Sequence, residues 1–197
     1  MMNFLGISKS NLRRKILSYF FTNPDSNLYL REIANIINED PGNLSRELSR
    51  LENEGIFKSI KRGNQKYFYL NKEYPLYKEL KSIVFKTIGI KGGIKKIFEK
   101  IGDVKLVFIY GSYAKSKENY LSDVDLIIIG SPDEDKLIIE LDRLENQLKR
   151  EINYKIYTMS EIKKEIKEKE PFILEILKDK KIIVIGDEHE LQKIAEG

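Results

Sequence analysis

Two apolar segments separated by a fixed polar spacing constrain the fold of this 197-residue chain more than any other feature. The first covers residues 104–110 and is followed at once by Gly111-Ser112. After ten intervening residues, Asp123-Val124-Asp125 leads into the second segment, LIIIG. Short apolar runs bounded by turn residues are typical of buried β-strands. We therefore expect two strands whose adjoining ends carry these polar residues.

The polar residues at these strand ends suit phosphate and metal chemistry. Gly111 allows a sharp turn and close approach of a ligand, and Ser112 falls where a helix start would favour phosphate. Asp123 and Asp125 are two residues apart, so they point to the same side of a strand, while Val124 points into the core. Two adjacent carboxylates repel each other unless a cation lies between them, and Mg²⁺ binds carboxylates together with substrate phosphates. In the alternative interpretation, Ser112 caps a helix and the acids are exposed loop charge.

The spacing of these residues resembles the signature of the minimal nucleotidyltransferases of the DNA polymerase beta superfamily. The resemblance covers roughly residues 76–160 and includes Ser122. It implies an α/β (α+β) nucleotidyltransferase fold with a small mixed sheet flanked by helices. It also implies that Asp123 and Asp125 are catalytic and bind Mg²⁺ or Mn²⁺, and that Gly111, Ser112 and Ser122 bind ATP or another NTP. The reaction implied is transfer of a nucleoside monophosphate to an acceptor hydroxyl, for example on a partner protein such as a toxin.

One position departs from this family pattern. The family usually supplies a third carboxylate from a later strand, here predicted at residues 151–158 after a helix at 134–149. The matching position is Asn153, which can ligate a metal but cannot take a proton. Glu151 would face the wrong way in a regular strand, although a frayed strand start would let it reach the site. Loss of general-base catalysis lowers a reaction rate by ~10²–10⁴-fold, so the sequence leaves open whether the chain is an active enzyme.

The N-terminal part has a different pattern. Helical spacing of apolar residues predicts helices at 10–21 and 30–38, and a third that Asn43 opens and Gly55 ends. Two β-prone runs then flank Gly63-Asn64, which can supply the positive φ of a hairpin turn. This order, over roughly residues 8–72, resembles the winged helix-turn-helix family. The resemblance implies a domain that binds double-stranded DNA and a role in transcription regulation.

The candidate DNA contacts are polar residues of the third helix and the hairpin tip. On the helix they are Asn43, Ser45, Arg46 and Arg50, with Ser49 beside them; at the tip they are Arg62 and Lys66, with Lys61 and Asn64. Such side chains can reach base edges or phosphates in a major groove. Alternatively, they form a solvated helix face on a protein-contact module. We interpret Tyr67, Phe68 and Tyr69 as hairpin core and flank rather than as a base-stacking platform.

The charge distribution indicates a domain boundary near residue 75. Residues 1–75 contain 12 Lys or Arg and 8 Asp or Glu, whereas the rest of the chain contains 23 of each kind. The formal charge of +4 therefore lies entirely in the first part, which favours a polyanionic partner. We predict a winged helix-turn-helix domain at 1–75 and a nucleotidyltransferase-like domain at 76–197.

Composition excludes several classes of protein. There is no cysteine and one histidine, so disulfides, thiolate metal sites and multi-histidine zinc sites are excluded. No apolar run reaches the ~18–20 residues that cross a bilayer, and no signal peptide is evident. We therefore expect a cytoplasmic protein with no membrane partner. The remaining patterns predict helices at 76–87, 91–101 and 159–178, the last interrupted at Pro171, and a strand at 182–185.

Three functions remain compatible with these patterns. The first is a nucleotidyltransferase that modifies a partner. The second is a DNA-binding regulator whose degenerate nucleotidyltransferase domain senses nucleotide or mediates assembly. The third is an RNA-modifying transferase in which the winged helix grips RNA. Winged-helix regulators often form dimers, so a homodimer stays open, although no long heptad pattern argues for it.

Overall fold

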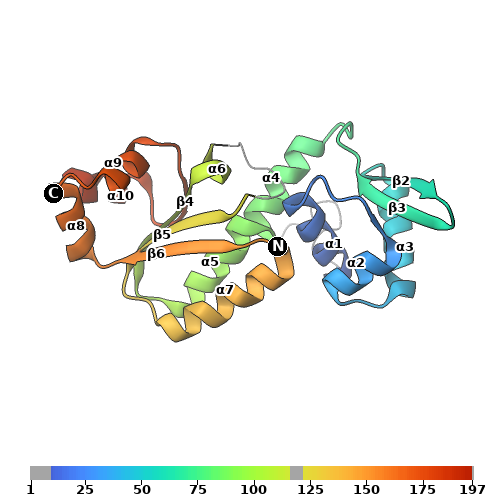
Figure 1. Ribbon diagram of the computed structural model, residues 1–197, viewed down its shortest axis with the longest axis horizontal. Coiled ribbons are helices and arrows are strands. Elements are labelled where there is room, and N and C mark those ends of the chain that lie inside the picture. The colour runs from blue at the N-terminus through green and yellow to red at the C-terminus, as the bar shows by residue number, and fades with distance from the viewer. Residues whose placement is uncertain (1–9, 116–121, 197) are drawn as a thin grey trace. The chain divides into compact units, whose positions relative to one another are not determined.

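The computed structural model describes residues 10–115 and 122–196 and divides into two compact units (Figure 1). The first unit comprises the described residues up to Gly92 together with Gln147–Lys149. The second comprises Gly93–Asn146 and the described residues from Arg150 onward. Residues 116–121, which form most of the loop between the two predicted strands, lie outside the described residues.

The first unit combines helices with a three-stranded antiparallel sheet. Its elements are α1 (Asn11–Thr22), β1 (Leu28–Tyr29), α2 (Leu30–Ile37), α3 (Pro41–Asn53), β2 (Phe57–Arg62), β3 (Gln65–Leu70) and α4 (Tyr77–Thr87). The strand order is β1-β3-β2. Ser10 is the N-cap of α1, and its side chain accepts a hydrogen bond from the Arg13 N–H. Helix α3 starts two residues earlier than expected, because Asp40 is its N-cap and Pro41 occupies the first turn, where a missing N–H costs nothing.

The hairpin predicted around Gly63-Asn64 is confirmed. Strands β2 and β3 pair from Phe57↔Leu70 to Arg62↔Gln65, and Gly63 has a φ of +58°. Asn64 does not share this positive φ, so the turn has the φ pattern of type II′, which suits the right-handed twist of a hairpin. Strand β1, only two residues long, adds Leu28 and Tyr29 to the free edge of β3 and was not predicted.

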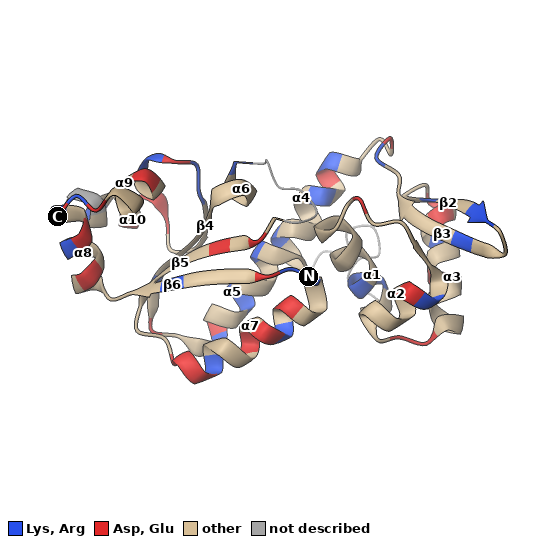
Figure 2. Ribbon diagram, in the orientation of Figure 1, with Lys and Arg blue, Asp and Glu red and all other residues tan. Residues whose placement is uncertain are grey.

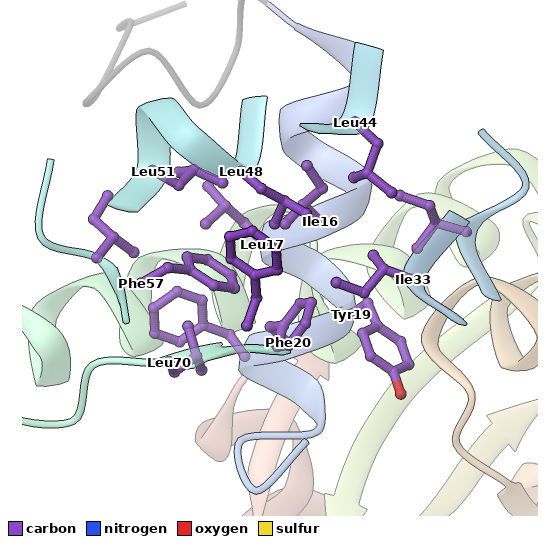
Figure 3. Close-up of a cluster of buried hydrophobic side chains, with 14 of the residues drawn as sticks. Ile16, Leu17, Tyr19, Phe20, Ile33, Leu44, Leu48, Leu51, Phe57 and Leu70 are labelled. Carbon is purple, nitrogen blue, oxygen red and sulfur yellow. The ribbon is translucent and has the colours of Figure 1, made fainter. Parts of the chain in front are cut away.

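The core of the first unit extends past the predicted domain boundary. Phe20 of α1 and Phe57 of β2 meet edge to face at 4.8 Å, and the apolar side of α3 packs beside them (Figure 3). Leu80 and Val84 of α4 are fully buried in the same cluster. The compact unit therefore extends beyond residue 75, where charge indicated its end, because α4 buries its apolar stripe here.

A buried ion pair fixes α3 against α1 within this unit. Arg13 and Glu47 are 7% and 5% exposed, and Arg13 Nη1 donates to Glu47 Oε1 at 3.2 Å. The same guanidinium also pairs with Glu54. Removing one partner of a buried pair leaves an uncompensated charge, so the pair specifies one packing of the two helices. It thereby sets which side of α3 faces solvent.

The second unit contains a small mixed sheet flanked by helices, as the sequence predicted. Its elements are α5 (Ile90–Ile101), β4 (Val104–Tyr110), α6 (Gly111–Ala114), β5 (Val124–Gly130), α7 (Glu134–Leu148), β6 (Ile152–Tyr157), α8 (Met159–Lys167), α9 (Pro171–Lys178), β7 (Ile182–Ile185) and α10 (Glu188–Glu196). The strand order is β6-β5-β4-β7. Strands β5 and β6 are parallel, and the other pairs are antiparallel. Of the helices in the described part of the chain, none has the length and apolarity needed to span a bilayer.

Helices cover both faces of this sheet, and the site lies at the edge where strands end and begin. Apolar residues of α8, α9 and α10 pack with Phe108 and Ile127 on one face, and α5 and α7 run along the other (Figure 1). Gly93 of α5 lets α7 approach closely, since an added Cβ would lie 2.5 Å from Leu144. At one edge the end of β4 meets the starts of β5 and β6. This is the edge at which the predicted Gly-Ser and Asp-x-Asp residues lie.

Candidate functional site

The two predicted acids lie at the start of β5 in different environments. Asp123 directly precedes the strand and is exposed, whereas Asp125 is half-buried within it. Val124, between them, is fully buried, as the alternation of a strand requires. Burial, and secondly the charge of Asp123, raise the pKa of the Asp125 carboxyl. Each cause opposes ionisation, so a cation bound by both carboxylates would stabilise the pair. Figure 2 shows this acidic band on β5.

Gly111 brings the backbone into contact with Asp125. Tyr110 and Asp125 are directly opposite in the β4–β5 ladder, and Gly111 follows with a φ of +72°. A Cβ at Gly111 would lie 2.6 Å from Asp125 Oδ2, which is closer than van der Waals contact allows. Only glycine therefore permits both the turn and the position of this carboxylate. Ser112 is half-buried in the first turn of α6, the short helix that the sequence predicted to start here.

Asn153, which the sequence analysis matched to the third carboxylate of the family pattern, lies beside both acids. It is the direct partner of Asp125 in the parallel β5–β6 ladder, and its Nδ2 donates to Asp123 Oδ2 at 3.4 Å. Glu151 precedes β6 and is exposed, and its carbonyl accepts a hydrogen bond from the Val124 N–H at 2.9 Å. In residues 10–115 and 122–196, no three Asp, Glu or His side chains form a metal-ligating cluster. Among the described residues, the candidate metal ligands at this edge of the sheet are therefore two carboxylates and one amide.

A buried arginine that the sequence patterns did not indicate supports the backbone of this site. Arg150 is 5% exposed and donates from Nη1 to the carbonyl oxygen of Ser122 at 3.0 Å. It therefore holds the residue that precedes Asp123. Ser122 itself was predicted to bind nucleotide, and it lies beside the acids as expected. Nothing in the local sequence identifies Arg150, because its partner is 28 residues away.

Aromatic and basic side chains lie beside the acids on the same face of the sheet. Tyr110 meets the ring of Phe172 edge to face at 5.9 Å, and the Lys155 Nζ lies 3.9 Å from the centre of that ring. Burial, then the charge of Asp125, raise the pKa of Tyr110. Lys155 is two residues beyond Asn153 on β6 and so shares its face. A cation and aromatic rings near paired acids are suited to a nucleotide, which carries both phosphates and a flat base.

The predicted DNA-contact residues lie on α3 and the β2–β3 hairpin of the first unit. Asn43, Arg46 and Arg50 are exposed on α3, Ser45 is half-buried, and Arg62 and Lys66 are exposed on the hairpin. Several already have partners within the unit. Arg46 Nη2 donates to Asn43 Oδ1 at 2.6 Å, Arg50 pairs with Glu47 at 3.3 Å, and Lys66 pairs with Glu52 at 2.6 Å. The structure thus places all of these side chains on one unit.

A comparison with known families matches most of the second unit. Residues 93–189 match the family model described as Polymerase beta, Nucleotidyltransferase. This part of the chain is therefore similar to nucleotidyltransferases. The match contains every residue of the site at Asp123 and Asp125, and we name this site and its sheet, after that similarity, the nucleotidyltransferase domain. No curated protein sequence matches the chain.

Three solved structures illustrate the range of structural similarity. A crystal structure of a toxin–antitoxin with AMP-PNP aligns at 13% identity over 54% of this chain and 81% of that chain, with a TM-score of 0.38. The tri-AMPylated Shewanella oneidensis HEPN toxin in complex with MNT antitoxin aligns at 13% identity over 53% and 76%, with a TM-score of 0.33. A putative nucleotidyltransferase from Sulfolobus solfataricus aligns at 15% identity over 47% and 73%, with a TM-score of 0.27.

Proposed function

We propose that the nucleotidyltransferase domain binds a nucleoside triphosphate with Mg²⁺ and transfers a nucleoside monophosphate to an acceptor hydroxyl. One observation carries this proposal. Asp125 lies against Gly111 on one side and opposite Asn153 on the other, and Asn153 in turn contacts Asp123. Polar side chains of β5 and β6 therefore converge beside the turn that follows β4.

The residues present fit a hard divalent cation. Mg²⁺ is usually held by one or two carboxylates plus waters and substrate phosphates rather than by a full protein cage. Asp123 and Asp125 would supply the carboxylates, and the side-chain oxygen of Asn153 could turn to the metal in place of its amide group. Burial, and secondly the charge of Asp123, raise the pKa of Asp125, and a bound cation would offset both effects, which is a further sign of fit. When bound, the metal would neutralise the charge of the phosphates.

The protein groups around the acids have separate roles in this proposal. Gly111 and Ser112 would hold the phosphates, Ser122 would contact the nucleotide, and Lys155 would balance phosphate charge. Arg150 is a positioning residue, since it holds the Ser122 backbone and not the substrate. The acceptor that we propose is a hydroxyl on a partner protein, such as a toxin, as the sequence resemblance implies. ATP is the first nucleotide to test.

The transfer is tested with ATP labelled on the α-phosphate, Mg²⁺ and candidate acceptors, including partner proteins and RNA. We expect label in an acceptor with the unaltered chain and a fall to background in the Asp123→Ala/Asp125→Ala variant, because the metal ligands are gone. The matched control is Asp142→Ala, an exposed acid on α7 of the same unit. Labelling that survives loss of both acids, or that also disappears in the Asp142→Ala protein, would contradict the proposal.

A second candidate function follows from Asn153. A site with two carboxylates and an amide can bind NTP–Mg²⁺ without a group to deprotonate the acceptor. The chain would then be a DNA-binding regulator whose nucleotidyltransferase domain senses nucleotide or mediates assembly, including assembly of a homodimer. Nucleotide binding that depends on Asp125, with no transfer to any acceptor, would favour this candidate over the enzyme.

We further propose that the first unit is a winged helix-turn-helix module that binds double-stranded DNA. The order of its elements supports this, since α2 and α3 are joined by a short turn and are followed by the β2–β3 hairpin. The exposed residues of α3 include Arg46 and Arg50, and the hairpin tip is basic (Figure 2). In either candidate function this module would bind DNA, and it would bind RNA if the acceptor is RNA.

The DNA proposal is tested by titrating fluorescent mixed-sequence duplex at several salt concentrations. We expect Arg46→Ala/Arg50→Ala to weaken binding and to reduce the slope of log K against log salt by about 0.9 for each phosphate that the variant no longer neutralises. The matched control is Arg143→Ala. The Arg143 and Arg50 side chains are both 71% exposed, and each pairs with a glutamate three residues earlier in its helix. Equal affinities for all three proteins would count against α3 as the DNA-contact helix.

A further inference from the structure

The face of the β1–β3–β2 sheet that points away from α3 carries a group of tyrosine and basic side chains. Lys58 is paired with Tyr69, Ile60 with Tyr67, and Tyr29 also with Tyr67. Directly paired residues point to the same side of an antiparallel sheet, and alternate residues of a strand share a face. These side chains, together with Arg62, therefore form one surface, which we call the tyrosine face.

The opposite face of the same sheet is the one that packs on the core and on α3. Phe57, Phe68 and Leu70 point to that side and are buried. Glu52 of α3 accepts hydrogen bonds from Ser59 and Lys66, which lie on the same side as Phe68. The tyrosine face is thus separate from the α3 surface proposed for duplex DNA. Our sequence interpretation of the three aromatics was hairpin core and flank: Phe68 lies in the core, and Tyr67 and Tyr69 lie half-buried on the tyrosine face.

A groove of about 520 Å³ lies on this face. Its walls are β2, Tyr69, the α1–β1 connection at residues 24–27 and the segment 71–73 that follows β3. The volume falls within the roughly 300–1,000 Å³ of typical small-ligand sites, so it can hold a nucleotide-sized group. Ile60 in the groove is 45% exposed, so the groove offers apolar as well as polar contact.

The rings and charges of this face match the chemistry of an unpaired nucleotide strand. Tyr29 and Tyr67 are fixed against each other with centroids 5.7 Å apart, and the Arg62 guanidinium lies 5.2 Å from the Tyr67 ring. Residues 57–70 contain four Lys or Arg and no Asp or Glu. Aromatic side chains on a basic surface stack unpaired bases while the cations hold the backbone phosphates. Bases in a duplex are stacked on each other and cannot use such rings.

The acids near the groove do not cancel this attraction. Lys58 pairs with Glu73, and Lys72 pairs with Asp25 at 2.6 Å, but both pairs are between exposed side chains. Exposed pairs contribute little to stability, so phosphates can replace the carboxylates at small cost. Arg62 pairs with no carboxylate of the residues that the structure describes, and its contact with Tyr67 leaves its donors available for phosphate.

We propose that the tyrosine face binds single-stranded nucleic acid, with bases stacked on Tyr67 and Tyr69 and phosphates held by Lys58, Arg62 and Lys72. This binding goes beyond the proposed transfer reaction and does not depend on the site at Asp125. Single-stranded RNA and DNA share the bases and phosphates that this surface recognises, and only RNA has the 2′-hydroxyl. Which of the two binds more tightly is decided by measurement.

The test is fluorescence anisotropy with the full chain and labelled 12-nucleotide strands of RNA and of DNA in one mixed sequence. We expect Tyr67→Leu/Tyr69→Leu, which keeps apolar volume and removes the stacking rings, to weaken binding by about tenfold or more for each ring. Arg62→Gln, an exposed change that leaves the core intact, should lower the salt slope by about 0.7. Tighter binding of one strand than of the other identifies RNA or DNA as the ligand.

Duplex binding and the α3 variant supply the controls. The tyrosine variant should keep its duplex affinity, and Arg46→Ala/Arg50→Ala should keep its affinity for the single strands. A thermal melt of each variant verifies folding. The proposal is overturned if neither strand binds, if Arg62→Gln and the tyrosine variant bind as the unaltered chain does, or if single strands compete with duplex for the α3 arginines. Binding of an unstructured peptide with equal affinity would also overturn it.

Discussion

In the absence of metal, the Asp125→Asn protein is expected to melt at a higher temperature than the unaltered chain at neutral pH. Burial and the charge of Asp123 raise the pKa of Asp125 in the folded state. A group whose pKa is raised by folding stabilises the fold below its unfolded pKa, and this contribution is lost as pH rises through the folded pKa. At pH 7 the ionised carboxylate therefore opposes folding, and a neutral amide of the same shape removes that cost.

The same substitution is expected to weaken binding of NTP–Mg²⁺ strongly. Loss of an outer partner of a metal site typically costs about 10–100-fold in affinity, so loss of a direct ligand should cost at least as much. Mg²⁺ with ATP should consequently raise the melting temperature of the unaltered chain but not that of the variant. The measurements are thermal melts in EDTA at pH 4 and pH 7, repeated with Mg²⁺ and ATP, and titration of a fluorescent ATP analogue.

Asp133→Asn is a control at an acid whose pKa is lowered, whereas that of Asp125 is raised. Hydrogen bonds from Lys136 lower the pKa of the exposed Asp133 at the start of α7. Its ionised form therefore favours the fold at pH 7, and the amide should not raise the melting temperature. Nucleotide binding should not change. A variant of Asp125 that is less stable than the unaltered protein in EDTA, or that still binds nucleotide as tightly, would refute the assignment of the acid pair.

The residues that the sequence placed correctly are those whose position depends on local pattern. Strand β4 ends at Tyr110 and α6 begins at Gly111 as expected, because an apolar run followed by glycine is a local signal. The family resemblance and the alternation of β6 together assigned Asn153 to the site, and the structure pairs it with Asp125. The period of a strand is fixed by the backbone, so it can be read without knowing the neighbouring strands.

The features that sequence reasoning missed depend on contacts between distant segments. Strand β1 has two residues, which is too short for a periodic signal, and it exists because Leu28 and Tyr29 pair with β3. Helix α4 belongs to the first unit because Leu80 and Val84 pack in the core of that unit. The charge distribution had indicated a domain boundary before this helix. Helix α10 (Glu188–Glu196) was not predicted from the sequence. A side chain such as that of Arg150 gains its role from a carbonyl that no spacing rule identifies.

The converse gain-of-function change is Asn153→Asp, which is expected to raise nucleotidyl transfer by ~10²–10⁴-fold, the usual contribution of a general base. The new carboxylate would stand opposite Asp125 and beside Asp123 Oδ2, where the present amide donates its hydrogen bond. Three adjacent carboxylates repel, so the variant should be less stable than the unaltered chain in EDTA and should regain stability with Mg²⁺. Initial rates with α-labelled ATP, melting temperatures and a count of bound Mn²⁺ by electron paramagnetic resonance measure these effects.

Two comparison variants separate the explanations for the outcome. Asn153→Ala removes the amide without adding a base, so it should not raise the rate. Glu151→Gln tests whether the exposed acid before β6 already acts as the base; if it does, this variant is slow and Asn153→Asp gains little. A rate for Asn153→Asp that equals that of the unaltered chain, with Glu151→Gln also unchanged, would show that proton transfer does not limit the reaction. The second candidate, a nucleotide-sensing regulator that lacks a base, predicts instead no transfer by the unaltered chain and transfer only after Asn153→Asp supplies one.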